Sequence, residues 1–365
     1  MDPKWDDTRA KQFTSLLLAW KEANPRPLPW KGERDPYLIW LSEIILQQTR
    51  VAQGLPYFER FRARFPDVYA LAQASEDEVY KLWEGLGYYS RARNLMESAR
   101  YIANELNGQF PDSYAGLKSL KGVGPYTAAA IASFAYDLPY AVVDGNVYRV
   151  LARVLGLSTP VDTTQGKRLF GEWAQKLLDT DAPGAYNQAI MDFGAMQCKP
   201  VSPLCDSCPM YDICEARKSA QVGKLPVKSK RLERRVRYFH YLVLKYQGRV
   251  VLRKRREKDI WKNLFDFPLL ESETPEMDRV SLQNAPIWKA LMNESKPPVD
   301  FCSKPYQQTL THQRIIARFW EFELTEPRHA IEDEYFVEEL ENLSKFAFPK
   351  IVDWYLNDKS LYLEL

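Results

Sequence analysis

The sequence predicts a multidomain chain, with an all-α part covering roughly the first two thirds and an α+β domain after it. Over residues 8–217 apolar residues recur three and four positions apart, and Pro and Gly punctuate the pattern. After Arg237 the pattern becomes alternating, which is typical of β-strands. A group of four cysteines, Cys198–Cys214, closes the helical part. Helices first and strands later indicate separate domains.

The helical part divides into elements at its Pro, Gly and capping residues. Asp35 and Pro36 suit the cap and first position of a helix that runs over Tyr37–Gln48. Further apolar periods predict helices at Pro56–Arg64, Asp77–Trp83, Ser90–Leu106, Tyr114–Leu120, Tyr126–Tyr136, Val147–Leu155, Thr164–Leu178 and Ala182–Met196.

The C-terminal third has strand signals. Alternating residues on both sides of the turn at Gln247-Gly248 predict a β-hairpin. A further strand is predicted at Arg314–Leu324, with helices at Glu338–Asn342 and Lys350–Tyr355. Ahead of this domain, Lys224–Arg237 carries seven basic residues against one acidic residue. We interpret that segment as a solvated linker, which could also lie beside a polyanion.

The bulk composition is that of a soluble globular protein. The 365 residues are 45% hydrophobic and carry a net charge of +2, so binding to nucleic acid would need a local basic patch. The N-terminus has no secretory pattern, and no apolar run is long enough for a bilayer. Five cysteines, four of them clustered, favour a reduced metal-binding site over disulfides. We expect a cytoplasmic, nucleoid-associated protein that does not bind membranes.

The stretch from Leu120 to Asn146 combines a Gly-rich turn with a carboxylate. Gly122 and Gly124 can adopt positive φ and allow close approach of a ligand to the backbone. Pro125 suits the first turn of a helix, whose free amides would suit a phosphate. The stretch therefore predicts a phosphate-binding turn some twenty residues before a possible catalytic carboxylate.

Glu43 and Asp144 have opposite settings. Glu43 lies among bulky apolar residues, where desolvation would raise its pKa, although an exposed or ion-paired Glu is the slightly favoured interpretation of that segment alone. Asp144 opens a helix, which would keep it ionised, and an ordinary helix cap is the simpler interpretation. Taken together, a protonated carboxyl and an ionised one suit cleavage of a bond to a sugar carbon.

The four cysteines are the strongest single pattern. Cys198, Cys205, Cys208 and Cys214 offer four soft ligands, which suit zinc or an iron–sulfur cluster. Zinc ribbons favour two short cysteine pairs, and only Cys205 and Cys208 form one here. The spacing therefore favours iron–sulfur.

Several motifs occur together and in order. They are Ser-Glu-Ile-Ile-Leu-Gln-Gln-Thr around Glu43, Gly85-Leu-Gly-Tyr-Tyr-Ser-Arg, Leu120-Lys-Gly-Val-Gly-Pro-Tyr-Thr, Val143-Asp-Gly-Asn-Val and the cysteine spacing. In combination they closely resemble the MutY-type adenine DNA glycosylases of the helix-hairpin-helix superfamily. The resemblance is dense from about Trp20 to Cys214 and looser beyond. It implies one [4Fe-4S] cluster, a double-stranded DNA partner with A opposite 8-oxoguanine, and a monomer that flips adenine out and cleaves its N-glycosidic bond.

The resemblance also implies roles for individual residues. Glu43 would protonate adenine at N7, and Asp144 would stabilise the oxocarbenium-like sugar. Asn146 and Tyr126 would assist these two carboxyl groups, while the backbone at Gly122, Val123 and Gly124 would hold the DNA. Residues expected to enclose the flipped adenine or to enter the duplex at the mispair are Arg26, Trp30, Gln188, Gln48 and Tyr88.

One residue position distinguishes monofunctional from bifunctional glycosylases of this superfamily. Bifunctional glycosylases of this superfamily carry a lysine after the hairpin that forms a Schiff base with the sugar. Tyr126 stands at that position here, and Lys121 lies inside the hairpin instead. We therefore expect a monofunctional glycosylase. The alternatives are an endonuclease-III-like glycosylase/lyase for oxidised pyrimidines and a non-catalytic iron–sulfur DNA-binding protein.

The C-terminal domain resembles the Nudix-like module of the same family. No Gly-x5-Glu-x7-Arg-Glu-x2-Glu-Glu run follows residues 261–268, which implies recognition without hydrolysis. Leu310-Thr311-His312 matches the family's Phe-Ser-His loop, so Thr311 and His312 would read the 8-oxoguanine, with Leu310 in place of the aromatic residue. The domains expected are a six-helix barrel with the helix-hairpin-helix at 30–137, an iron–sulfur subdomain at 1–29 and 138–217, a linker at 218–236, and a Nudix-like domain at 237–365.

Overall fold

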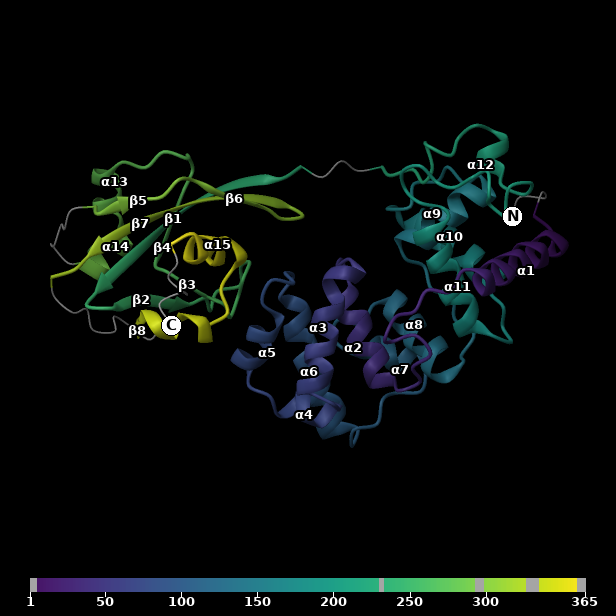
Figure 1. The fold of residues 1–365 in the computed structure, drawn as a ribbon, viewed down its shortest axis with the longest axis horizontal. Helices are drawn as coiled ribbons and strands as arrows, with labels where there is room; N and C mark the ends of the chain where they lie inside the picture. The colour runs from purple at the N-terminus through teal and green to yellow at the C-terminus, as the bar shows by residue number, and fades with distance from the viewer. Residues whose placement is uncertain (1–4, 230–232, 293–298, 326–334, 360–365) are drawn as a thin grey trace. The chain divides into compact units, whose positions relative to one another are not determined.

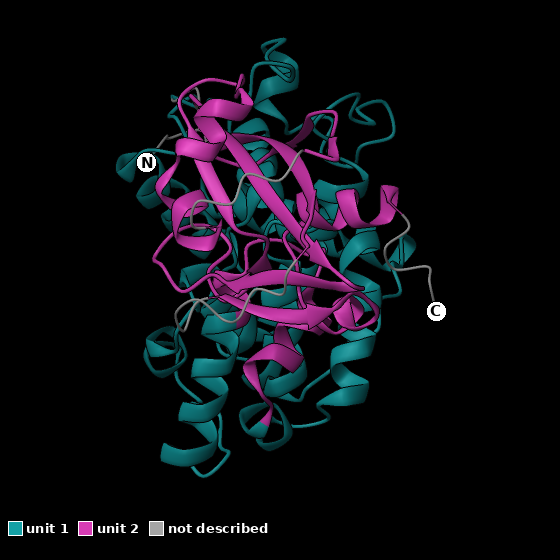
Figure 2. Cartoon of the chain, turned by 90° about the vertical axis from the view of Figure 1, so that its left-hand side faces the viewer, with its two compact units in different colours: residues 1–73, 93–231 teal, residues 74–92, 232–365 magenta. Residues whose placement is uncertain are grey.

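The computed structural model describes residues 5–229, 233–292, 299–325 and 335–359. It divides into two compact units, coloured separately in Figure 2. Unit 1 comprises residues 1–73 and 93–231, and unit 2 comprises residues 74–92 and 232–365. The described part of unit 1 contains helices and no strand, whereas unit 2 contains a mixed sheet with helices. The fold class predicted from the sequence is confirmed.

The described part of unit 1 is built from helices (Figure 1). They are α1 (Asp7–Ala23), α2 (Pro36–Leu46), α3 (Val51–Arg64), α4 (Val68–Gln73), α6 (Ser90–Glu105), α7 (Tyr114–Ser119), α8 (Pro125–Tyr136), α9 (Gly145–Leu155), α10 (Thr164–Leu177), α11 (Pro183–Met196) and α12 (Glu215–Lys218). The N-terminal residues of α6, up to Ala92, are grouped with unit 2.

The α2 helix is buried on every side. Asp35 caps it by accepting from the amide of Tyr37 at 2.9 Å, and Pro36 takes the first turn, as predicted. All residues from Tyr37 to Ile45 are buried, which explains the nearly continuous apolar sequence. Packing against α8 holds this helix in place beside the hairpin. Glu43 is thereby fixed in an apolar setting.

A second core joins the first and last helices of unit 1. It contains fully buried side chains such as Phe13 on α1, Val150 on α9, Phe170 on α10 and Phe193 on α11. The amphipathic period of α9 turns its own apolar side chains, such as Val150, into this core. Asp144 stands at the N-terminus of the helix. The core therefore fixes α9 and α11 against each other.

The hairpin between α7 and α8 differs in one detail from the expectation. Gly122 has φ +77°, and a Cβ there would lie 2.9 Å from the Asn94 Cβ, so glycine is required. Gly124 instead caps α8 with φ −88°, which any residue adopts. The prediction of positive φ is confirmed for Gly122 and wrong for Gly124.

Unit 2 holds an eight-stranded mixed sheet and α5 (Glu76–Trp83). The long strands β1 (Arg235–Tyr246) and β7 (Gln313–Glu323) run parallel from Arg235 opposite Gln313 to Lys245 opposite Glu323. The order β3-β2-β1-β7-β5 is completed by β4, β6 and β8, which pair with β1, β7 and β2. The other elements are β2 (Arg249–Lys254), β3 (Phe265–Asp266), β4 (Leu269–Ser272), α13 (Arg279–Asn284), α14 (Pro286–Met292), β5 (Phe301–Cys302), β6 (Tyr306–Thr309), β8 (Tyr335–Glu339), the 3-10 helix η1 (Leu340–Lys345) and α15 (Lys350–Asp358).

Two predictions outside the long elements were wrong. The helix expected at Glu338–Asn342 is the end of β8 followed by η1, because residues 335–339 pair with β2 across the sheet. The basic segment is not wholly solvated either. Leu225 is buried in the core of unit 1, and the amide of Val161 donates to the Val227 carbonyl at 3.0 Å. Only the later residues can act as a linker, and 230–232 lie outside the described residues.

Candidate active site

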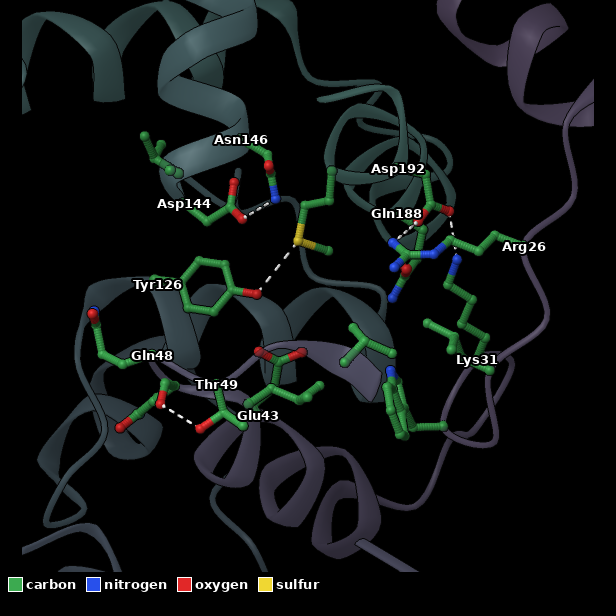
Figure 3. A pocket seen from close by; sticks show the side chains of 18 residues that line it. Arg26, Lys31, Glu43, Gln48, Thr49, Tyr126, Asp144, Asn146, Gln188 and Asp192 are labelled. Carbon is green, nitrogen blue, oxygen red and sulfur yellow. Dashed lines mark hydrogen bonds and ion pairs between the residues drawn. The ribbon is translucent and has the colours of Figure 1, made fainter. Parts of the chain in front are cut away.

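Unit 1 contains a cavity of about 460 Å³ between α2, the start of α8, the start of α9 and α11. That volume is in the usual range for small-ligand pockets, about 300–1,000 Å³. Figure 3 shows its lining side chains. Of the residues predicted from the sequence, the lining includes Arg26, Trp30, Glu43, Gln48, Tyr126, Asp144, Asn146 and Gln188.

Glu43 projects from α2 into this pocket (Figure 3). Its side chain is buried, with 7% of the residue exposed. The pKa of the carboxyl is raised to about 7, because burial and, to a smaller extent, the charge of Asp144 raise it by more than a hydrogen bond from Tyr126 lowers it. Glu43 can therefore carry a proton near neutral pH. The exposed or ion-paired setting that the segment alone slightly favoured is wrong, because the carboxyl is desolvated among the apolar residues of α2.

Tyr126 lies in the first turn of α8, between the two carboxyl groups. Its hydroxyl donates to the sulfur of Met191 at 3.4 Å, and it is close enough to Glu43 to lower the pKa of that carboxyl. Burial, and then the negative charge of Glu43 and Asp144, hold the pKa of Tyr126 well above its usual value. The phenol therefore remains a neutral donor at the carboxyl pair.

Asp144 caps α9 with both of its oxygens. Oδ1 accepts from the amide of Val147 at 2.7 Å, and Oδ2 accepts from Asn146 Nδ2 at 2.9 Å. Burial raises the pKa of Asp144 above its usual value, while these hydrogen bonds and the charge of Arg149 lower it. The helix start therefore opposes the effect of burial without cancelling it.

Arg149 connects this carboxylate to the cysteine segment. Its Nη2 donates to Asn146 Oδ1 at 2.8 Å and to the Gly194 carbonyl at 2.7 Å, and its Nε donates to the Cys198 carbonyl at 2.8 Å. One buried guanidinium thus fixes Asn146, which in turn donates to Asp144. Sequence reasoning missed Arg149. Its position three residues after Asn146, on the same face of the predicted helix, was the available signal.

The opposite wall of the pocket is charged. Asp192 on α11 accepts from Lys21, Arg26 and Lys31, and all but Lys21 line the pocket. Trp30 packs edge-on against Phe58 with ring centroids 5.3 Å apart. Arg26 and Trp30 were predicted from the sequence, whereas Lys31 and Asp192 were not. Asp192 stands four residues after Gln188 on one helix face, which is the pattern that could have revealed it.

The hairpin backbone has fewer amides available to a phosphate than the sequence predicted. The Val123 side chain is buried, and its amide donates to the Leu120 carbonyl at 3.1 Å, so that amide is not available to a phosphate. Gln47 Nε2 contacts the Gly122 carbonyl at 3.3 Å and Thr127 Oγ1 at 3.2 Å, which ties the hairpin to α2. The turn is thus held directly beside the pocket.

The four cysteines lie in one loop segment that ends at α12. The pKa of the Cys208 thiol is raised to about 12, mainly by burial, with a smaller contribution from charge on the other three cysteines. Arg153 Nη1 lies 3.4 Å from the Cys198 sulfur and binds the Lys199 carbonyl at 2.7 Å, so α9 orders the segment. Four thiols beside a buried arginine suit a thiolate-bound cluster.

The thiol spacing bears on which metal group would fit. A tetrahedral zinc ion, with Zn–S bonds of about 2.3 Å, would bring its thiolates to within about 4 Å of one another. Among the described residues, no three Cys, His, Asp or Glu side chains are grouped closely enough to hold one metal ion. A cluster of four irons separates its thiolates more widely and is held by four cysteines, which is the ligand set that this segment supplies.

In unit 2, Tyr88 and Thr311 are brought together. The Tyr88 hydroxyl and Thr311 Oγ1 lie 2.6 Å apart. Tyr88 has φ +49° and is 47% exposed in a loop, as expected from the glycines around it. Thr311 and the exposed His312 form the tip of the β6–β7 hairpin, closed by the Leu310 amide on the Gln313 carbonyl at 2.8 Å. Gln48 in unit 1 also has positive φ, +57°.

Three known families match successive parts of the chain, in the order that the sequence predicted. The model for HhH-GPD superfamily base excision DNA repair proteins matches residues 41–176. The iron-sulfur binding domain of endonuclease III matches residues 198–214, the cysteine segment. A NUDIX domain matches residues 240–358.

Two curated relatives are similar over most of both chains. The adenine DNA glycosylase of Buchnera aphidicola subsp. Schizaphis graminum (strain Sg) is 37% identical over 262 residues, 72% of this chain and 76% of the relative. That of subsp. Acyrthosiphon pisum (strain APS) is 34% identical over 293 residues, 80% of each chain. This chain belongs to the adenine DNA glycosylases. A solved thermostable thymine-DNA glycosylase is also similar, with a TM-score of 0.55, 29% identity, and coverage of 58% of this chain and 98% of that one.

This adenine DNA glycosylase is accordingly an N-glycosylase of base excision repair. The expected iron–sulfur domain and the expected NUDIX-like domain are both confirmed. No helix in the described residues is long and apolar enough to cross a membrane. The boundaries drawn from the sequence inside unit 1 stay predictions.

Proposed function

We propose that the chain flips adenine opposite 8-oxoguanine into the pocket of unit 1 and hydrolyses its N-glycosidic bond. The observation that carries the proposal is the pair of carboxyl groups on the pocket wall, Glu43 on α2 and Asp144 at the start of α9. Tyr126 lies between them as a neutral donor. The family membership supports adenine as the base, and Trp30 offers an aromatic wall for it.

The two carboxyl groups divide the reaction. Glu43 donates its proton to adenine N7, so adenine leaves as a neutral base when its bond to the sugar C1′ breaks. The positive charge left on the sugar faces the Asp144 carboxylate, either as an ion pair or as a transient covalent bond. Water then adds to C1′ and releases a proton, leaving an abasic site. Asn146, held by Arg149, keeps the carboxylate oriented through its hydrogen bond at 2.9 Å.

We assign recognition of 8-oxoguanine, on the strand opposite the adenine, to unit 2. Thr311 and His312 stand at the tip of the β6–β7 hairpin and offer a hydroxyl and ring nitrogens to 8-oxoguanine. The exposed Tyr88 and Gln48, each with positive φ, would enter the duplex at the mispair. Gly122 and Gly124 would contact the DNA backbone.

The four cysteines would hold a [4Fe-4S] cluster that orders the loop after α11. Arg149 and Arg153 link that loop to α9. We also propose a monomer as the acting form.

The reaction is proposed to stop at the abasic site. Tyr126 occupies the position at which a lyase would carry a lysine. The pocket does contain Lys31. Burial lowers the pKa of its amine, but the ion pair with Asp192 at 2.5 Å opposes this effect and engages the amine, which would otherwise be free to attack the sugar. Borohydride trapping should therefore capture little covalent protein–DNA adduct.

One assay tests the proposed function. The purified protein is incubated with duplexes carrying A opposite 8-oxoguanine, A opposite G, or thymine glycol opposite A, and the products are split into samples with and without alkali. We expect strand breaks from the first two duplexes only after alkali. Breaks without alkali would indicate a lyase, and cleavage of the thymine glycol duplex alone would refute the proposal.

A further inference from the structure

A buried carboxylate on the pocket wall binds three cations at once. Asp192 is 2% exposed. Its Oδ2 accepts from Lys21 Nζ at 2.6 Å and Lys31 Nζ at 2.5 Å, and its Oδ1 accepts from Arg26 Nη1 at 3.1 Å. Figure 3 shows the Arg26 and Lys31 side chains converging on it beside Gln188. Neither carboxyl of the proposed reaction takes part in this cluster.

These ion pairs join three segments that are far apart in the sequence. Lys21 is in the last turn of α1, Arg26 and Lys31 lie in the connection before α2, and Asp192 lies on α11. Met191, its neighbour on α11, accepts the hydrogen bond of Tyr126. One carboxylate thus fixes the connection to the helix that contacts the reactive side of the pocket.

We infer that Asp192 is a positioning residue of this glycosylase, which holds Arg26, Lys31 and the intervening Trp30 in the arrangement that closes around a flipped base. The inference rests on the proposed function, since it needs a base in the pocket. A buried carboxylate that accepts from three donors is held in one arrangement, and the same hydrogen bonds fix the positions of the three donor side chains. Without the carboxylate, the three cations would repel one another and the connection would lose its anchor.

The net charge of the Asp192 cluster distinguishes a positioning role from simple electrostatic attraction of DNA. Three cations and one carboxylate leave an excess of positive charge at the pocket wall. Replacing Asp192 with Asn adds one more positive charge, which by itself should favour the DNA polyanion. A positioning role therefore predicts slower base removal without weaker duplex binding.

The test uses the full-length Asp192→Asn variant and a duplex with A opposite 8-oxoguanine. Three quantities are measured: the excision rate at saturating enzyme, the half-saturating enzyme concentration, and the fluorescence of 2-aminopurine substituted for the adenine. We expect the rate to fall about 10- to 100-fold, as for misplaced binding groups. The fluorescence gain on flipping should fall with it, while the half-saturating concentration should not rise.

Asp137→Asn is the matched control. Asp137 binds Arg34 of the same connection at 2.6 Å, but its side chain and that of Arg34 are 58% and 62% exposed, so the pair contributes little. Its φ of +51° is one that Asn adopts readily. This variant should excise at the wild-type rate.

The inference is overturned if Asp192→Asn matches the wild type in rate and fluorescence. It is also overturned if rate, duplex binding and melting temperature all fall together, as expected for a purely structural residue. No adenine excision by the wild type would instead refute the proposed function, and the inference with it.

Two further variants keep the test decisive if Asp192→Asn does not fold. Arg26→Gln and Lys31→Gln each leave Asp192 with two cations. Each should lower the excision rate at saturating enzyme and reduce the flipping signal. Wild-type values for both would show that the anchored connection does not position the base.

Discussion

At the scale of single residues, the site depends on one carboxyl that carries a proton near neutral pH. Glu43 has its pKa raised to about 7 mainly by burial, whereas Asp144 has two hydrogen bonds and a nearby guanidinium that oppose the same effect. The difference lies in the partners and not in the residue type. A carboxyl with few partners is suited to be the acid, and one with several is suited to be the carboxylate that stabilises positive charge on the sugar.

The first prediction concerns the pH dependence of excision. Glu43 must be protonated to donate, so the rate should fall as pH rises through about 7, approaching tenfold per pH unit above it. Single-turnover rates between pH 5.5 and 9 measure this. A rate that stays level or climbs from pH 7 to 9 would be incompatible with Glu43 as the acid.

The second prediction concerns stability. The unfolded chain releases the Glu43 proton near its usual pKa of 4.5, but the folded chain keeps it to about 7, so the folded state loses stability between these values as pH rises. At about 1.4 kcal/mol per pKa unit the loss is about 3 kcal/mol. The stability of Glu43→Gln relative to wild type should therefore increase by about 3 kcal/mol from pH 4.5 to pH 8, as measured by denaturant unfolding. An unchanged difference would show that Glu43 is not held protonated.

At the scale of elements, the contact between α9 and α11 sets the position of the Asp144 carboxylate. Gly194 on α11 meets Asn146, and a Cβ at that glycine would lie 2.6 Å from the Asn146 Cβ. The Gly194 carbonyl also accepts from Arg149 at 2.7 Å. The helices can approach this closely only because one residue has no side chain.

The third prediction follows from that contact. Gly194→Ala should push Asn146 away and lower the excision rate about 10- to 100-fold. It should also destabilise the fold by about 1–3 kcal/mol. Gly171→Ala on α10 is the matched control, since nothing lies within 4 Å of its Cβ position, and it should gain up to about 1 kcal/mol. Equal activity of the two variants would contradict the account of α9.

Helices and strands were predictable where the local sequence signals agree. The helix after Asp35 and the strands around Gln247-Gly248 were expected within a few residues, because caps, turns and apolar periods all agree there. Residues 338–339 were misassigned because their pairing partner, β2, lies almost ninety residues away. Strands of two residues, such as Phe265–Asp266, carry no periodic signal at all.

The site was predictable where motifs carry it. Glu43, Asp144 and the cysteines stand in contiguous motifs, and the structure places both carboxyls in one pocket. The position of Asp192 one turn after Gln188 was the one local signal of its cluster. Its partners come from α1 and a connection, and ion pairs between such distant segments show no spacing pattern in the sequence.

At the scale of the whole molecule, the chemistry and the proposed recognition belong to different units. The pocket lies wholly in unit 1. The Thr311 tip lies in unit 2 together with Tyr88, which the sequence places between α5 and α6. The segment at residues 74–92 therefore belongs by its contacts to the sheet domain, for example through the Lys254–Asp77 ion pair at 2.6 Å.

The fourth prediction tests this division. Thr311→Val keeps the shape and removes the hydroxyl that contacts Tyr88. The preference for A opposite 8-oxoguanine over A opposite G should fall about tenfold, about 1.4 kcal/mol, while the excision rate from A opposite G changes little. Thr309→Val, at an exposed position of β6, is the control and should keep the preference. Equal preferences in all three proteins would remove Thr311 from recognition.

The most direct test of the account compares Glu43→Gln with the wild type. Gln keeps the size and polarity of the side chain and cannot donate a carboxyl proton. Single-turnover excision of adenine opposite 8-oxoguanine should slow about 100- to 10,000-fold, with duplex binding retained. Removal of adenine by Glu43→Gln at the wild-type rate would contradict the central claim.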